Sequence, residues 1–360
     1  MSRFFGSMAK ESDVSYLMSH ISYQKKMKAI VLHGIKKPLV IQEVPAPQLS
    51  GHEALVRVKA AALNRRDWWI QQGQYAGLKF PIILGSDGMG IVEAVGADAG
   101  NTWVGKEVVL NPSMAWGDNE AFQQKSFSIL GLPQDGTFAE YVRVPVENLY
   151  EKPRHLSFEE AAALPLGGLT AYRALFSRAK LVAREKVLVV GTGGGVASFT
   201  LQFALHAGAE VYVTSGSRIK IEQAIAMGAS GGALYTEEGW AQQLLEKTGG
   251  FDVIVDSALG DAFTHHLDLM NPGGRIVFFG GTAGNIPPLN ARKIFWKQLS
   301  ILGTTMGSPR DFSQMLSFVD DHRIKPVVDS VYALDEAEAA IRSMDDSSQF
   351  GKIVLSVERM

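Results

Sequence analysis

The chain has 360 residues, of which 46% are hydrophobic, 35 are Lys or Arg and 37 are Asp or Glu, and its formal net charge is −2. This length predicts two domains with substantial cores, and the balanced charge predicts no binding to nucleic acid or to an anionic membrane. The sequence contains no cysteine, which excludes disulfides, thiolate catalysis and cysteine-ligated zinc.

Residues 1–26 differ from the rest of the chain because they are rich in serine, mixed in charge and without a continuous apolar core of the signal-peptide type. We expect an extension that is either disordered or the product of a tag or an upstream start site, with a transit peptide as the alternative. No apolar stretch reaches the roughly 18 to 20 residues that span a bilayer. We therefore expect a soluble, cytoplasmic protein with no membrane partner.

Short runs of β-forming residues, punctuated by Gly and Pro, dominate from Met27 to about Tyr150. They predict a compact β-rich domain. From Ser157 to about Met306 strands alternate with helical patterns, and this alternation predicts a doubly wound parallel sheet.

From about Gly307 the β-forming pattern of the first domain returns. Helices are expected over 311–321 and 334–344, and strands over 327–332 and 352–357. The sequence therefore predicts an α/β protein in which a β-rich catalytic domain is split around an inserted nucleotide-binding domain. We assign residues 27–167 and 307–360 to the catalytic domain and 168–306 to the insertion. The ligand is expected in the cleft between them.

A glycine-rich turn lies between a strand at 187–190 and a helix from about Val196 to Ala207, and it consists of Gly191, Thr192, Gly193, Gly194 and Gly195. Glycines allow close approach to a phosphate, and the first N–H groups of the helix attract an anion. The turn reads G-x-G-x-x-V, so Val196 stands at the position of the third glycine, which serves helix packing. A second strand at 210–215 completes a βαβ unit. The pattern indicates a dinucleotide pyrophosphate site, with a structural glycine turn as the alternative.

The residues after the second strand bear on the choice of cofactor. An NAD site places Asp or Glu at the end of this strand to bind the ribose, but this chain has Ser215. Ser217 and Lys220 follow, and their hydroxyl and ammonium groups suit a 2′-phosphate. The sequence therefore predicts NADP(H), although Lys220 could instead be a solvated helix lysine.

Several ordered motifs give the chain a family resemblance: AAALNRRD at 60–67, LGSDGMGIV at 84–92, GTFAEYV at 136–142, AAALP at 161–165, LTAY at 169–172 and GGRIV at 273–277. With these motifs the chain resembles the medium-chain dehydrogenase/reductase superfamily. The resemblance implies a GroES-like catalytic domain, a Rossmann domain and a homodimer joined near residues 300–303.

The resemblance also implies where zinc ligands would fall in zinc-dependent members. Those positions hold Asn64, Ser86 and Leu166 here, and the segment 111–132, which corresponds to a cysteine-rich lobe, has no cysteine. Asn, Ser and Leu do not form a tetrahedral zinc site. We therefore expect no metal, and the chain is similar to the zinc-free branch of quinone oxidoreductases and enoyl reductases.

Within that branch the resemblance implies two catalytic residues. Asn64 matches an asparagine beside the nicotinamide and substrate, and its alternative role is a loop cap. Tyr75 falls where some enoyl reductases carry a tyrosine suggested to protonate the substrate; a phenol can donate a proton or stabilise an enolate. Its alternative role is an aromatic wall of the cleft.

The resemblance further implies cofactor contacts outside the glycine turn. Tyr235 matches a tyrosine that reaches the 2′-phosphate. Thr170 is placed near the nicotinamide ribose, where it could instead cap or pack its helix. The contacts expected at the nicotinamide carboxamide come from Phe279, Gly280, Thr304, Thr305 and Met306.

The resulting hypothesis is a zinc-independent, NADPH-dependent oxidoreductase that transfers hydride to a small molecule, either a quinone or an α,β-unsaturated carbonyl compound. The alternatives are a zinc-free alcohol or aldehyde oxidoreductase and a non-catalytic NADPH-binding sensor or scaffold protein.

Overall fold

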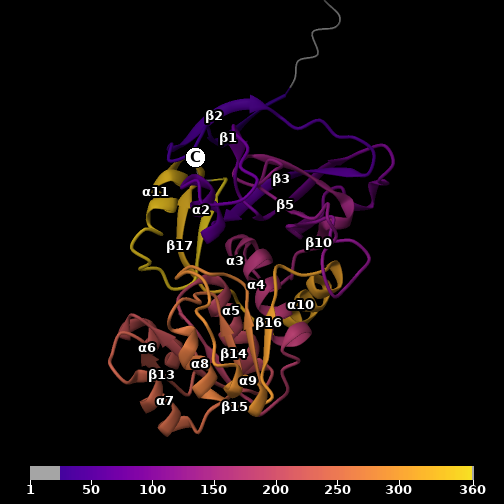
Figure 1. Ribbon diagram of the computed structural model, residues 1–360. Helices are drawn as coiled ribbons and strands as arrows, with labels where there is room; N and C mark the ends of the chain where they lie inside the picture. Colours follow the sequence, from indigo (N-terminus) through magenta and orange to yellow (C-terminus); the bar gives the residue numbers. More distant parts are fainter. Residues whose placement is uncertain (1–24, 359–360) are drawn as a thin grey trace, which may run out of the picture.

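The computed structural model describes residues 25–358. Figure 1 shows an upper lobe of strands from both the first and the last part of the chain, in indigo and yellow, above a lower lobe of strands and helices in orange. The expected extension, residues 1–26, falls almost entirely outside the described residues. The first strand, β1, begins at Lys26, one residue before the expected domain start.

The upper lobe is built on a sheet with the strand order β10-β6-β5-β3-β18-β17, with β9 paired to β3 as well. Its strands are β3 (Glu53–Ala62), β5 (Asp87–Val95), β6 (Glu107–Leu110), β9 (Tyr141–Pro145), β10 (Leu149–Glu151), β17 (Val328–Ala333) and β18 (Lys352–Ser356). β18 pairs antiparallel to β3, with Val354 opposite Ala62. The end of the chain therefore completes a sheet that the beginning started, which confirms the predicted split domain.

The lower lobe contains a six-stranded sheet with the order β13-β12-β11-β14-β15-β16, and all of its pairs are parallel. The strands are β11 (Lys186–Val189), β12 (Glu210–Ser215), β13 (Gly231–Leu234), β14 (Phe251–Asp256), β15 (Met270–Phe278) and β16 (Ser300–Gly303). The order reverses between β11 and β14, and ligands bind outside the carboxyl ends of the strands at such a switch point. The predicted doubly wound sheet is confirmed.

The remaining strands are β1 (Lys26–Leu32), β2 (Leu39–Pro45), β4 (Ile82–Ile83), β7 (Ser113–Met114) and β8 (Ser128–Ile129). The α-helices are α2 (Arg65–Gln71), α3 (Phe158–Ala163), α4 (Pro165–Tyr172), α5 (Gly195–His206), α6 (Arg218–Ala226), α7 (Trp240–Thr248), α8 (Phe263–Leu269), α9 (Ala291–Trp296), α10 (Pro309–Asp321) and α11 (Ala337–Arg342). A π-helical turn spans Arg173–Arg178, and 3-10 turns span Asn101–Trp103, Val146–Asn148 and Leu334–Glu336.

The helix expected over 334–344 is shorter than predicted. The Glu336 carboxylate accepts a hydrogen bond from the Ala333 N–H at 2.8 Å, which closes a 3-10 turn before α11 begins at Ala337. None of the helices within residues 25–358 is long and apolar enough to cross a membrane.

One apolar cluster runs from the upper sheet through α4 and α5 into the lower sheet. It includes Ala60 and Ala62 of β3, Leu169 of α4, Phe199 of α5 and Val187 of β11, all nearly or fully buried. Buried apolar surface is the main favourable term in folding. The shared cluster therefore fixes the two lobes relative to each other and positions the walls of the cleft between them. The domain boundaries expected at 167/168 and 306/307 stay predictions.

Candidate active site

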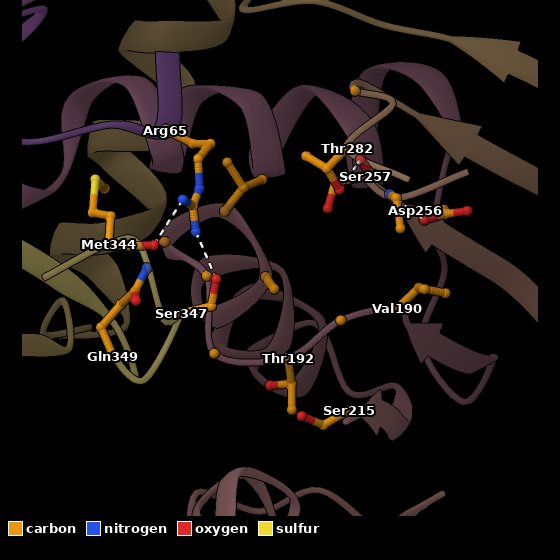
Figure 2. A pocket seen from close by; sticks show the side chains of 18 of the residues that line it. Arg65, Val190, Thr192, Ser215, Asp256, Ser257, Thr282, Met344, Ser347 and Gln349 are labelled. Carbon is orange, nitrogen blue, oxygen red and sulfur yellow. Dashed lines mark hydrogen bonds between the residues drawn. The ribbon is translucent and has the colours of Figure 1, made fainter. Parts of the chain in front are cut away.

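A cleft of about 1360 Å³ lies at the carboxyl ends of the parallel strands and is lined by residues of both lobes. Figure 2 shows its walls, with Thr192 and Ser215 on one side, Asp256 and Ser257 on another, and Arg65, Met344 and Ser347 from the upper lobe. Every predicted site residue except Thr304 lines this cleft. The cleft therefore brings together segments that are far apart in the sequence.

The glycine-rich turn has the backbone of a phosphate cradle. Gly191 and Gly193 adopt φ angles of 74° and 114°, which side chains disfavour. The space where a Cβ of Gly191 or Gly194 would lie is empty within 4 Å. The hydroxyl of Thr192 is buried without a hydrogen-bond partner, and the N-terminus of α5 opens beside it. These features fit a dinucleotide pyrophosphate.

The missing third glycine has a structural counterpart. A Cβ on Gly195 would lie 2.6 Å from Cδ of Lys352. Gly195 therefore makes room for this side chain of the upper lobe and not for a strand of the parallel sheet. The close approach to α5 is provided by Gly167 of α4, where an added Cβ would meet the Phe199 ring at 3.1 Å. Val196 is half-buried and lines the cleft.

The predicted 2′-phosphate residues gather at the end of β12. Ser215 is 3% exposed, and its Oγ accepts a hydrogen bond from the Ser217 N–H at 3.1 Å. The Tyr235 hydroxyl lies 2.8 Å from the position that a Cβ of Gly216 would take. β12 ends on Ser215 and not on a carboxylate, although Asp329 and Asp346 line the same cleft.

Lys220 lies between this group and the glycine turn. Its Cδ is 2.7 Å from the place of a Gly193 Cβ, and its Nζ donates to the Ser347 carbonyl oxygen. Burial lowers the pKa of this ammonium, while Asp329 and Asp346 oppose the shift. Figure 2 shows Arg65 beside the same segment, where it donates to the Met344 carbonyl and the Ser347 hydroxyl, both at 2.9 Å.

At the other end of the cleft lie the residues expected near the nicotinamide. Thr170, Phe279, Gly280, Thr305 and Met306 all line the wall. The Thr170 hydroxyl donates to the Leu166 carbonyl at 2.8 Å, one turn earlier in α4. Thr304 does not line the cleft, and its N–H donates to the Phe278 carbonyl at 2.9 Å.

Asn64 is held on both ends of its amide by a buried ion pair. Its Nδ2 donates to Oδ2 of Asp87 at 2.9 Å, and its Oδ1 accepts from Nζ of Lys352 at 2.7 Å. Lys352 also donates to Asp87 at 2.8 Å and to the Leu63 carbonyl at 2.7 Å. Asp87 is 0% and Lys352 is 3% exposed. Such a satisfied, buried network fixes the amide in one orientation.

A second buried cation lies next to Tyr75. Nη1 of Arg66 donates to the Ser86 hydroxyl at 2.7 Å and to the Leu130 carbonyl at 2.9 Å. Its Nε lies 3.4 Å from the Tyr75 hydroxyl oxygen, which accepts this bond. The guanidinium carbon is 5.1 Å from the centre of the Tyr75 ring. Because the phenol accepts from Arg66, its own proton is left to be donated elsewhere.

Comparison with known proteins identifies the two lobes. Residues 50–154 match the family model of the alcohol dehydrogenase GroES-like domain, and residues 195–321 match that of the zinc-binding dehydrogenase. The zinc-type alcohol dehydrogenase-like protein YogA of Leptosphaeria maculans is 34% identical over 342 residues, which cover 89% of this chain and 95% of that protein. This chain is a medium-chain dehydrogenase/reductase.

Other members of the family extend the comparison. The acryloyl-coenzyme A reductase of Sulfurisphaera tokodaii is 30% identical, with 91% of this chain and 99% of that protein covered. The quinone oxidoreductase of Mus musculus is 29% identical, with 92% and 98% covered. A crystal structure of an NAD-dependent alcohol dehydrogenase superposes with a TM-score of 0.86 at 37% identity and covers 92% of this chain and 100% of that chain. The protein is thus an oxidoreductase with the split GroES-like and Rossmann fold.

The donor set at the zinc positions of this family does not suit zinc. Asn64 and Ser86 accept hydrogen bonds from Lys352 and Arg66. Leu166 has an apolar side chain, and its backbone N–H donates to Asp87 at 2.7 Å. Zinc takes Cys, His or carboxylate ligands. Within residues 25–358, no three His, Asp or Glu side chains gather to hold a metal ion.

The sequence did not predict the buried charged residues that contact Asn64 and Tyr75. Lys352, Asp87 and the role of Arg66 were not predicted, because a lysine or arginine is normally exposed and nothing in their local pattern indicates burial. The one available signal was position, since Asp87 follows Ser86 and Arg66 lies two residues after Asn64 within the motifs that carried the resemblance.

Proposed function

We propose that this medium-chain dehydrogenase/reductase reduces an α,β-unsaturated carbonyl compound or a quinone with NADPH, without zinc and as a homodimer. The observation that carries the proposal is that one cleft joins the glycine-rich turn to Asn64 and Tyr75, while two fixed cations, Lys352 and Arg66, hydrogen-bond to the residues expected at the zinc-ligand positions. The relation to acryloyl-coenzyme A reductase and quinone oxidoreductase supports the same reaction class.

The cofactor would be held along the cleft wall. Gly191 to Val196 and the hydroxyl of Thr192 would bind the pyrophosphate, and Ser215, Ser217, Lys220 and Tyr235 the 2′-phosphate. A bound nicotinamide supplies the hydride. The absence of an acid at Ser215 supports NADPH, because a carboxylate there would repel the phosphate.

The chain's own residues then orient the substrate and limit the access of water. The Asn64 amide, fixed by Asp87 and Lys352, presents its remaining N–H for the substrate carbonyl. Trp69 and Ile129 add apolar wall beside it. Fixed orientation in a cleft that excludes water is the main catalytic contribution that such a site can make.

The proposal is tested by measuring NADPH and NADH oxidation with a quinone, an enone, an enoyl thioester and an aldehyde, each with and without a chelator. We expect turnover of the enone or quinone, a preference for NADPH and no effect of the chelator. Ser215→Asp should weaken NADPH binding by about tenfold, or about 1.4 kcal/mol, and leave NADH binding unchanged. Chelator-sensitive activity rescued by zinc would contradict the zinc-free mechanism. Tight NADPH binding without any turnover would instead support a sensor.

Tyr75 is proposed as the proton donor. Tyr75→Phe keeps the ring against Arg66 and removes only the hydroxyl. We expect kcat for the enone to fall by about 10², with the affinity for NADPH unchanged in a fluorescence titration. Unchanged kcat would make Tyr75 a wall of the cleft only.

A further inference from the structure

Arg66 is a buried cation without an acidic partner. Its side chain is 8% exposed, and none of the ion pairs within 4.0 Å in the described part of the chain includes it. Arg173, which is similarly buried, pairs with Asp311, and buried Lys352 pairs with Asp87. A charge removed from water is costly unless an anion compensates it. Asp67 acts on this guanidinium from beyond 4.0 Å and forms no ion pair with it, so a directly paired anion would have to come from outside the chain.

Two of the five N–H groups of Arg66, both on Nη2, are free to bind such an anion. Nε donates to Tyr75, and Nη1 donates to Ser86 and Leu130. Nη2 has no hydrogen-bond partner within residues 25–358, yet it is not one of the fully enclosed polar atoms that lack a partner. Since Arg66 lines the cleft, Nη2 faces the cleft.

The other cation at this place has no such freedom. Lys352 donates to Leu63, Asn64 and Asp87, which uses all three N–H groups of an ammonium. Lys352 therefore positions Asn64, whereas Arg66 still has donors for a ligand. Moreover, the guanidinium donates a hydrogen bond to Ser86, which stands at a position expected to carry a zinc ligand in zinc-dependent members of the family.

We propose that Arg66 is a catalytic residue that binds the substrate carbonyl oxygen through Nη2 and stabilises the enolate formed during reduction, in place of a metal ion. This inference rests on the proposed function. When hydride adds to the β-carbon, the C=C π pair forms the new double bond of the enolate and the C=O π pair moves to the oxygen. Arg66 stabilises the negative charge on that oxygen. A proton from Tyr75 then forms the Cα–H bond, the C=O bond is restored, and Tyr75 regains a proton from solvent.

The arrangement is set up before substrate arrives. The hydrogen bonds to Ser86 and Leu130, at 2.7 and 2.9 Å, hold the guanidinium in place, so little reorganisation accompanies the appearance of charge. The bond from Nε to the Tyr75 hydroxyl oxygen, at 3.4 Å, also holds the proton donor beside the guanidinium. One guanidinium thus supports both the oxygen that gains charge and the proton donor.

The test uses the full-length protein with Arg66→Gln, Arg66→Lys and Ser86→Ala, and with Arg143→Gln as a control, because Arg143 is an exposed arginine of β9. We expect Arg66→Gln to lower kcat for a neutral enone by about 10² to 10³ with little change in KM. Arg66→Lys and Ser86→Ala should lower kcat less, because they keep a cation at the site. Arg143→Gln should leave kcat unchanged.

A second measurement does not depend on turnover. 4-Nitrophenol is titrated into each variant without cofactor, and the absorbance of the bound dye reports whether it is the phenolate, an oxyanion that resembles an enolate. Wild-type protein should bind the phenolate in preference to the phenol, and Arg66→Gln should lose that preference. Thermal unfolding of each variant confirms that the fold is intact.

The outcomes separate this inference from the proposed function. If wild-type protein reduces the enone but Arg66→Gln matches it in kcat and in phenolate binding, the role of Arg66 is wrong and the proposed function stands. If Arg66→Gln raises only KM, and only for an enone that carries a carboxylate, Arg66 binds a substrate carboxylate and the enolate role is overturned. If neither an enone nor a quinone is reduced, the proposed function fails, and phenolate binding alone decides whether Arg66 binds an oxyanion.

Discussion

Asp67 combines full burial with an incompletely bonded carboxylate. It is 0% exposed, its Oδ2 accepts the Asn64 N–H at 2.8 Å, and its Oδ1 has no partner. Burial raises the pKa of this carboxyl to about 6, although Arg66 acts in the opposite direction. The start of α2 therefore depends on a group that resists ionisation.

This shift predicts a pH dependence of stability. A folded-state pKa above the unfolded value means that Asp67 favours folding below the unfolded pKa and that this contribution is lost as pH rises through about 6. Asp67→Asn keeps an acceptor for the Asn64 N–H. Relative to this variant, wild-type protein should lose about 1.4 kcal/mol of unfolding free energy between pH 5 and pH 8, measured by urea denaturation. Exposed Asp118→Asn is the control, and a pH-independent difference between wild type and Asp67→Asn would contradict the shift.

At the scale of elements, the first residue of α5 is constrained by the last strand of the upper sheet. A Cβ on Gly195 would overlap Cδ of Lys352 at 2.6 Å, and Lys352 cannot move aside because its Nζ is held by Leu63, Asn64 and Asp87. Gly195→Ala should therefore lower the unfolding free energy by about 1 to 3 kcal/mol.

Gly194 provides the matched comparison for this variant. A Cβ there meets nothing within 4 Å, and its φ of −75° is open to any residue. Gly194→Ala should leave the midpoint of urea unfolding, measured without cofactor, close to that of wild type. Equal changes in unfolding free energy for the two variants would show that the Lys352 side chain shifts to accommodate the added Cβ.

The elements of the parallel sheet could be predicted from sequence because each has a local signature. β11, the glycine turn and α5 follow from an apolar run, a cluster of glycines and a helical period, and each lies within one or two residues of its predicted place. The conformation of the glycine turn was predictable for the same reason, whereas its role as a phosphate site stays a prediction. The ion pair of Lys352 with Asp87 was not, since it joins residues 265 positions apart, and the burial of Arg66 depends on three separate segments closing around it.

At the scale of the whole molecule, the edge of the lower sheet bears on the proposed homodimer. β16 pairs with β15 and with no other strand in the described part of the chain, and exposed edge strands pair readily with a second chain. The neighbouring helix α9 leaves Phe295 66% and Trp296 82% exposed. An edge strand flanked by exposed aromatic side chains favours an interface between two copies.

We predict that wild-type protein sediments as a dimer and that Trp296→Glu shifts it toward monomer in analytical ultracentrifugation. The reason is that a buried charge at an apolar interface opposes association. Val104→Glu is the control, because Val104 is 46% exposed and belongs to the upper lobe. A monomeric wild-type protein would contradict the dimer.

The attachment of Lys352 to Asn64 also matters for how the protein is made. The two residues are 288 positions apart. At synthesis rates of about 5 to 20 residues per second, roughly 15 to 60 s therefore pass between the synthesis of Asn64 and that of Lys352. During that time β3 lacks the neighbour that β18 will supply, and the Asp87 carboxylate lacks its buried counter-ion. The nascent upper lobe is therefore incomplete until the nucleotide-binding lobe has been synthesised, and a chain that stops before β18 has neither a finished sheet nor an oriented Asn64.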